Sequence, residues 1–133
     1  MGGLFWKDRN VSFSFGKKEI KLKTRLVPFW YEGFGLMFTK LNTAKSLLFS
    51  YKFSSRMTLF SSFIPYEFLA VWVNSGNKIV GMKIVKRGES GVEPGVKFNR
   101  LIEIPLSKKF SLVTSFLLKN ISNFSKINFS VSE

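Results

Sequence analysis

The sequence offers few side chains that could do chemistry, and carboxylates are the most informative of them. The chain contains no cysteine and no histidine, so it lacks thiol nucleophiles, imidazole bases and the usual zinc ligands. Its eight acidic residues are scattered, and the closest two in sequence are Glu89 and Glu93. A site for a hard metal ion would have to collect carboxylates from distant segments. We therefore expect no metal ion and no cofactor, and we assign no catalytic residue.

Glu67 is the carboxylate that most needs an explanation, because it directly precedes an apolar stretch. If it is buried there, it needs a partner, and Arg56 is the candidate. With Met57 and Tyr66, these residues form the candidate ligand-binding set. A structural ion pair or a surface charge is the simpler interpretation of Glu67, ahead of a ligand-binding or acid–base role. Glu103 is open to both readings, and we expect it to point outward from a strand.

Lysine and arginine are the abundant charged residues. The chain has 21 of them and a net charge of +13, which attracts polyanions and acidic partners. Solvated basic faces are the simpler interpretation, and phosphate-backbone binding is the alternative. The candidate basic surface residues form two groups, Lys17, Lys18, Lys21, Lys23 and Arg25, then Lys83, Lys86, Arg87, Lys97 and Arg100.

Apolar and polar residues alternate near both ends of the chain, which predicts half-buried strands. Residues 11–15 and 19–23 show this alternation on either side of a turn at Gly16, so they predict a hairpin with one solvent-exposed face. Pro28 is expected to end the second strand, because proline has no N–H for a ladder. Residues 127–131 predict a closing strand.

The middle of the chain holds the most apolar segment. From Tyr66 to Val73 both alternate faces are apolar, which predicts a central strand that is covered on both sides. Turn residues 74–77 and the apolar residues up to Val85 predict an antiparallel partner strand. A long loop rich in glycine and proline is expected next, and then a strand from Phe98 to Pro105.

Two helices are expected. Gly33 and Gly35 allow a close backbone approach, so a short helix can begin after Gly35. From Leu106 to Phe124, apolar residues recur every three or four positions, which predicts an amphipathic C-terminal helix with Ser107 as its N-cap.

The combined pattern predicts a mainly β, single-domain fold, a β-sandwich or barrel-like, with these two helices. Residues 1–8 are expected to be an N-terminal extension, and residues 9–133 the domain. The N-terminal residues lack a secretory signal, and polar residues interrupt every apolar run before it reaches membrane-spanning length. We expect a cytoplasmic protein with no membrane partner.

Short motifs follow one another in a fixed order over roughly residues 9–132. They are Gly35-Leu36-Met37-Phe38, Leu47-Leu48-Phe49, Pro65-Tyr66-Glu67 with residues 68–76, Leu101-Ile102-Glu103-Ile104-Pro105, the helix from about Ser107 and the strand from Lys126 to Val131. This ordered set resembles the DUF192 (UPF0127) family of uncharacterised proteins. The resemblance implies the same β domain and implies no particular activity.

The chain departs from the DUF192 pattern around the candidate site. Residues 57–62 replace a tryptophan-methionine-lysine-asparagine-threonine stretch, and Glu67 stands in place of an aspartate. A site built from those polar residues in relatives is therefore altered here. We expect a non-catalytic module that binds a ligand or a protein beside Met57 to Glu67. The partner would be an acidic protein or nucleic acid; sequence-independent RNA binding and a carboxylate-based hydrolase are the alternatives.

Overall fold

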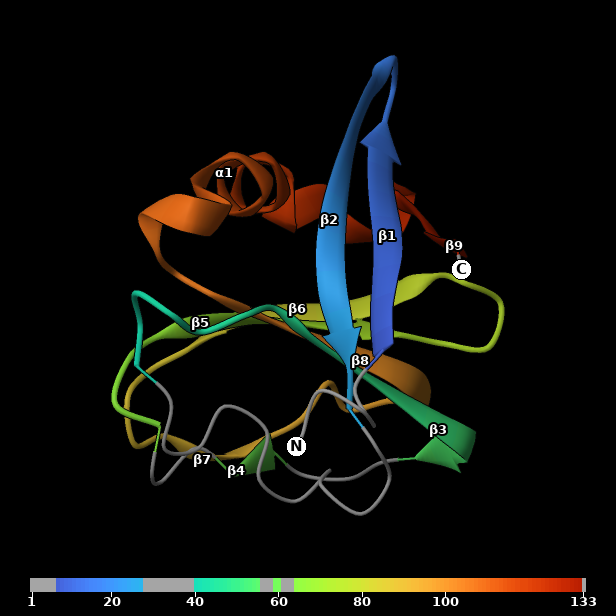
Figure 1. The fold of residues 1–133 in the computed structure, drawn as a ribbon. Coiled ribbons are helices and arrows are strands. Elements are labelled where there is room, and N and C mark those ends of the chain that lie inside the picture. The colour runs from blue at the N-terminus through green and yellow to red at the C-terminus, as the bar shows by residue number, and fades with distance from the viewer. Residues whose placement is uncertain (1–6, 28–39, 56–58, 61–63, 133) are drawn as a thin grey trace.

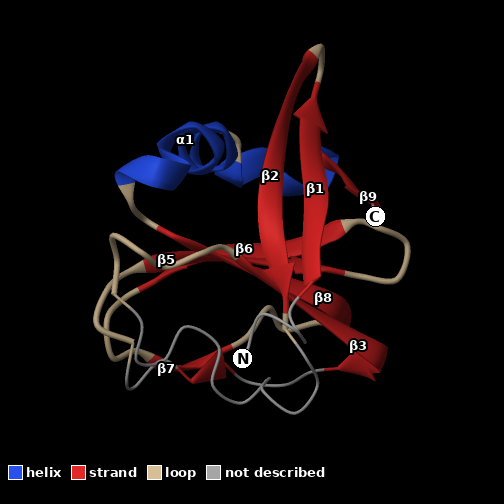
Figure 2. Cartoon of the chain, in the orientation of Figure 1, coloured by secondary structure: helices blue, strands red, loops and turns tan. Residues whose placement is uncertain are grey.

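The computed structural model describes residues 7–27, 40–55, 59–60 and 64–132, which form a mainly β fold (Figure 1). The strands are β1 Lys7–Phe15, β2 Lys18–Leu26, β3 Leu47–Ser55, β4 Leu59–Phe60, β5 Phe68–Val73, β6 Ile79–Val85, β7 Ser90–Val92, β8 Phe98–Pro105 and β9 Asn128–Ser132. The helix α1 spans Ser111–Lys119, between 3₁₀ helices at Lys108–Phe110 and Ile121–Lys126. Figure 2 shows these helical segments gathered on one side of the strands.

Seven strands form one curved sheet in the order β6-β5-β8-β3-β2-β1-β9, and β4 pairs with β7 separately. Every pairing in the large sheet is antiparallel except that of β2 with β3. The two ends of the sheet approach each other where Lys78 forms a bridge with Asn128. The sheet therefore curls almost onto itself, and the predicted mainly β, barrel-like fold is confirmed.

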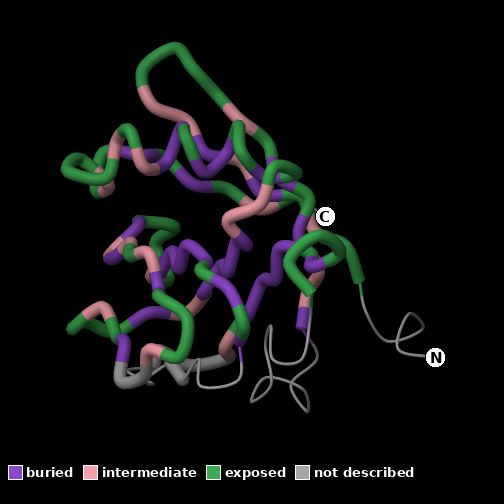
Figure 3. Tube along the Cα trace, turned by 90° about the vertical axis from the view of Figure 1, so that its left-hand side faces the viewer, coloured by how far each residue is buried: buried purple, intermediate pink, exposed green. Residues whose placement is uncertain are grey.

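The N-terminal hairpin and the closing strand are confirmed. β1 and β2 pair in the register Val11 opposite Leu22, and β9 pairs with the other edge of β1. Gly16 in the turn has a φ of 64°, a left-handed conformation that glycine adopts without strain. The rings of Phe13 and Phe129 lie 5.5 Å apart between centroids on the covered face. The hairpin extends beyond the rest of the sheet, and its turn is exposed (Figure 3).

The predicted double-sided strand is confirmed as β5, which lies between β6 and β8 and has all six of its residues buried. Leu69 and Val71 belong to a core cluster that also contains the apolar face of α1. Phe68 and Trp72 belong to a second cluster on the opposite face. Each face of β5 therefore has its own apolar cover, as its continuous apolar sequence requires.

The C-terminal helical pattern is present in three pieces. α1 buries Val113, Phe116 and Leu117 against the sheet. The α-helix ends at Lys119, and the Nδ2 of the C-cap residue Asn120 donates to the carbonyl of Phe116 at 2.8 Å. Ser107 holds the N-cap position of the first 3₁₀ helix, but its side chain makes no capping hydrogen bond. Its carbonyl instead accepts the N–H of Phe110 at 3.2 Å.

Other expectations meet the structure in part. The glycine-rich loop contains a short strand, β7, in which Val92 pairs with Leu59 of β4. β1 begins at Lys7, and β2 ends at Leu26. The helix expected after Gly35 lies outside the described residues. Within the described ranges, no helix has the length and apolar character needed to cross a membrane.

Candidate functional site

The predicted set around Glu67 is described only in part. The side chain of Glu67 is exposed, and its backbone carbonyl accepts the N–H of Leu106 at 3.2 Å. Tyr66 beside it is buried. Arg56 and Met57 lie outside the described residues, so a site formed by these four residues stays a prediction. The exposure of Glu67 removes the need for a buried partner.

Among the described residues Glu103 is the buried carboxylate, and the expectation that it points outward is wrong. Glu103 is only 2% exposed to solvent. In the sheet it stands between Ala70 of β5 and Leu47 of β3. These neighbours belong to the second core cluster, which covers the face that the sequence pattern assigned to solvent. The strand from Phe98 to Pro105 was predicted correctly, but at Glu103 both of its faces are covered.

Burial controls the protonation of Glu103. Desolvation raises the pKa of this carboxyl to about 8, because an apolar environment disfavours the charged form. Its Oε1 makes no hydrogen bond in the described structure, and the same holds for Nε1 of Trp72. Glu103 is therefore a neutral acid at neutral pH. Over the described ranges no three acidic side chains gather into a metal site.

The first basic group divides between two faces of β2. Lys21, Lys23 and Arg25 alternate with buried residues and share the outer face. Lys18 lies on the other face, where its Nζ is 5.7 Å from the ring centroid of Phe116. The ammonium of Lys23 lies 3.2 Å from a carboxylate oxygen of Asp8.

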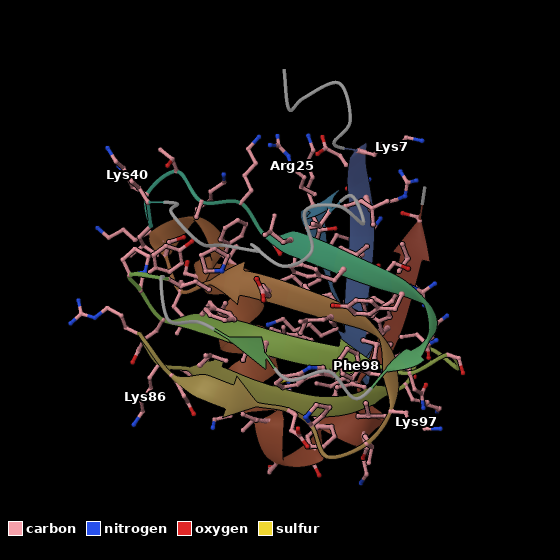
Figure 4. The ribbon with its side chains drawn as sticks, turned by 90° about the horizontal axis from the view of Figure 1, so that it is seen from below. Lys7, Arg25, Lys40, Lys86, Lys97 and Phe98 are labelled. Carbon is pink, nitrogen blue, oxygen red and sulfur yellow. The ribbon has the colours of Figure 1, made fainter. Side chains whose placement is uncertain are left out.

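The second basic group is separate and partly neutralised. Nζ of Lys83 lies 2.7 Å from Oε2 of Glu89, and the backbone N–H of Lys86 donates to Oε1 at 3.0 Å. The hydrogen bond from Lys83, with that from Lys86, lowers the pKa of Glu89. Arg87 is exposed nearby. In Figure 4, Arg25 lies at the upper edge of the molecule, Lys86 at the lower left and Lys97 at the lower right, so these three cations do not share one basic surface.

A groove of about 510 Å³ runs between β2 and the start of α1. Its lining combines an apolar part with cations on three separate segments, and Asp8 is the one acidic residue among the lining residues. The apolar residues are Ile20, Leu22, Phe110, Leu112 and Val113, and the cations are Lys21, Lys23, Arg25, Lys45 and Lys109. We call this the β2–α1 groove.

The groove follows an open edge of the sheet. β2 pairs with β1 along its whole length. With β3 it pairs only at Arg25 and Leu26. Residues 18–24 of β2 therefore have a strand partner on one side alone, as far as the described residues go. In Figure 1, α1 lies on the side of β2 away from β1, beside this edge.

Sequence patterns found only part of the groove. Lys21, Lys23 and Arg25 were among the candidate basic residues. Lys45 and Lys109 were missed, since only the parallel pairing of β2 with β3 and the packing of α1 bring them to β2. Leu112 could have been found from the sequence, because it falls outside the apolar stripe of its helix. In the structure it is 80% exposed.

Comparison with known proteins shows the fold. No family model and no curated protein matches the chain. A protein from Sinorhizobium meliloti 1021, described as a "putative transcription regulator", superposes with a TM-score of 0.74 at 11% identity, over 95% of each chain. A protein of unknown function from Novosphingobium aromaticivorans DSM 12444 superposes with a TM-score of 0.67 at 13% identity, over 93% of this chain and 84% of that one. At these identities the likeness defines a shared β-rich domain and no activity.

Proposed function

We propose that this domain is a non-catalytic binding module that holds an acidic protein segment in the β2–α1 groove. The observation that carries the proposal is the lining of the groove. Five cations from three segments line the groove together with its apolar residues, and Asp8 is the one carboxylate among the lining residues that the structure describes. Apolar contact area would supply affinity, and the cations would steer and orient an acidic partner.

The exposed apolar residue beside the cations supports a protein partner. Leu112 is 80% exposed and lines the groove. A partner side chain that covers it would remove apolar surface from water. A phosphate backbone would use the cations and leave this leucine uncovered.

The described exposed surface is less suited to nucleic acid. Proteins that bind single strands without sequence preference stack bases on aromatic side chains. The large exposed apolar residues of the described ranges are aliphatic, namely Leu41, Val96, Leu112 and Ile121. RNA binding is therefore the second candidate, and it rests on the net charge of +13.

We also propose that the chain is a DUF192-type domain. Within the described residues, the motifs that carry this resemblance fall on β3, β5, β8, the C-terminal helical region and β9, in the same order, whereas Gly35-Leu36-Met37-Phe38 lies outside them. One of the structural neighbours has no known function, which is compatible with an uncharacterised family. A binding module that has no fixed catalytic residues fits that picture.

The proposed function can be tested by reversing charge in the groove. Lys45→Glu with Lys109→Glu changes two cations that come from different segments. We expect the pair to weaken binding of an acetylated heptapeptide, in which glutamate alternates with valine, by about tenfold or more. Binding would be measured by fluorescence anisotropy at low salt.

The matched control is Lys97→Glu with Lys126→Glu, which alters two exposed lysines outside the groove. This pair changes the net charge by the same amount. We expect nearly unchanged binding from it. Equal losses from both pairs would show that attraction is unspecific and would remove the groove as the site. If a single-stranded RNA binds more tightly than the peptide and responds to the same groove variants, the nucleic acid alternative replaces the proposal.

A further inference from the structure

The open edge of β2 carries backbone groups that no described strand uses. The N–H of Arg25 donates away from β1, to the carbonyl of Ser46 at 2.9 Å. Along a strand, backbone groups of alternate residues point to the same side. The N–H and C=O groups of Glu19, Lys21 and Lys23 therefore point to the side that Arg25 uses, beyond the reach of the short β3 pairing.

We propose that the acidic partner binds as an added β-strand along residues 18–24 of β2. This inference rests on the proposed function and adds the mode of binding. The incoming segment would continue the line of β3 toward the hairpin turn and form ladder hydrogen bonds with Lys21 and Lys23. Strand addition of this kind takes its affinity from the main chain and its specificity from alternate side chains.

The two faces of β2 specify the sequence pattern of the partner. Ile20 and Leu22 point toward α1, where Leu112 and Val113 extend the apolar lining. Lys21 and Lys23 point to the opposite face and are exposed. An added strand places its own side chains alternately on these two faces. The fitting partner is therefore an extended segment in which acidic and apolar residues alternate.

Charge argues against a second copy of this chain as the occupant. Antiparallel pairing of two β2 edges in the register centred on Leu22 would set Lys21 of each copy against Lys23 of the other. Like charges on directly opposed residues destabilise a sheet. Lysines on an open edge also discourage unspecific strand pairing. An acidic strand turns the same lysines into attractive partners.

The first experiment follows amide hydrogen exchange by NMR with the glutamate–valine heptapeptide. On binding, we expect the amides of Glu19, Lys21 and Lys23 to exchange about tenfold more slowly. The amides of Ile20 and Leu22 point to β1 and serve as internal controls with little change. Slow exchange of the edge amides in the free protein would mean that the edge is already covered, and this would overturn the proposal.

The second experiment uses two N-methylated versions of the peptide, one methylated at every glutamate and the other at every valine. In an added strand only one of these sets directs its N–H groups to β2, so we expect one version to lose binding and the other to retain it. Loss on glutamate methylation indicates an antiparallel strand, because opposed residues then share a face. Loss on valine methylation indicates a parallel strand.

The outcomes separate the two proposals. Strand addition is overturned if both methylated versions bind, or if both lose binding, while Lys45→Glu with Lys109→Glu still weakens binding of the unmodified peptide. The proposed groove function stands in that case. If the unmodified peptide does not bind at all, the proposed function itself fails.

Discussion

β5 and β2 are both strands of the same sheet, but their surroundings differ. β5 has a strand on each side and an apolar cluster on each face, and all of its residues are buried. β2 has one complete strand partner, and exposed cations alternate with its buried residues. The buried surroundings of β5 stabilise the fold. The edge of β2 presents backbone groups and lysine side chains at the surface.

The contrast explains where a binding site can be placed in a small β domain. The part of the sheet formed by β5 and β8 is covered on both faces, so substitutions there are expected to lower stability strongly. This covered half also buries the carboxyl of Glu103, whose pKa is raised to about 8. The hairpin of β1 and β2 extends away from the other strands and contributes the partly unpaired edge of β2 (Figure 1). Functional surfaces of this kind are well placed on the less covered part of a fold, because changes there alter stability little.

The largest effect on stability is expected from Phe68→Ala in β5. Phe68 is fully buried in the second core cluster. Its truncation leaves a cavity and should lower the free energy of unfolding by about 3–5 kcal/mol. Urea denaturation followed by circular dichroism measures the change.

The comparison variant for Phe68→Ala is Lys23→Ala on β2. The Lys23 side chain is 72% exposed and its pairing with Asp8 is a surface one, so we expect a loss of about 1 kcal/mol or less. Similar losses from the two variants would contradict the division of the sheet into a covered half and an open half.

The next effect is a pH dependence that originates at Glu103. The folded pKa is about 8, above the ordinary value of 4.5, so the native state keeps a proton that the unfolded state releases. Stability from this group is complete below pH 4.5 and is lost as pH rises toward 8. Between pH 5 and pH 7.5, the free energy of unfolding should fall by about 1.4 kcal/mol per pH unit.

Glu103→Gln should remove this slope, and denaturant unfolding of both proteins across that pH range measures it. The absence of histidine keeps imidazole titration out of the window, which makes the difference easy to assign. A parent protein whose stability does not change between pH 5 and pH 7.5 would show that Glu103 is not buried as described.

The smallest of the three effects is expected at Gly81 in β6. An added Cβ there would lie 2.8 Å from Cβ of Pro94 and 3.2 Å from Cε3 of Trp72. Gly81→Ala should therefore destabilise the domain by about 1–3 kcal/mol through overpacking. Thermal unfolding monitored by calorimetry would detect it.

Gly76→Ala is the matched glycine control. Its added Cβ would meet only Oδ1 of Asn74, at 3.5 Å, which is ordinary contact. We expect a change within about 0.5 kcal/mol. If Gly81→Ala lowers stability as little as this control does, the contact between Pro94 and β6 at Gly81 is looser than described.

Local patterns in the sequence predicted most of the elements. Alternation specified β1, β2 and β9, the continuous apolar run specified β5, and the three-to-four spacing specified α1. These predictions succeed because a strand or a helix presents its faces with a fixed period, whatever it packs against. The end of α1 at Lys119 was not predicted, because the apolar spacing continues past it into a 3₁₀ segment.

Only the tertiary structure decided that both faces of β8 are covered at Glu103 and that one edge of β2 has no strand partner along residues 18–24 within the described residues. The sequence around Glu103 reads as a strand with one outward face, and burial came from a second core cluster assembled from distant segments. In the same way, Lys45 and Lys109 joined Lys21 and Lys23 only when β3 and α1 packed beside β2. Periodicity is a local property of the chain, so by itself it predicted most of the elements. The burial of a strand face, the pairing of a strand edge and the protonation of a buried acid depend on residues that are distant in sequence. They could therefore be determined only from the tertiary structure.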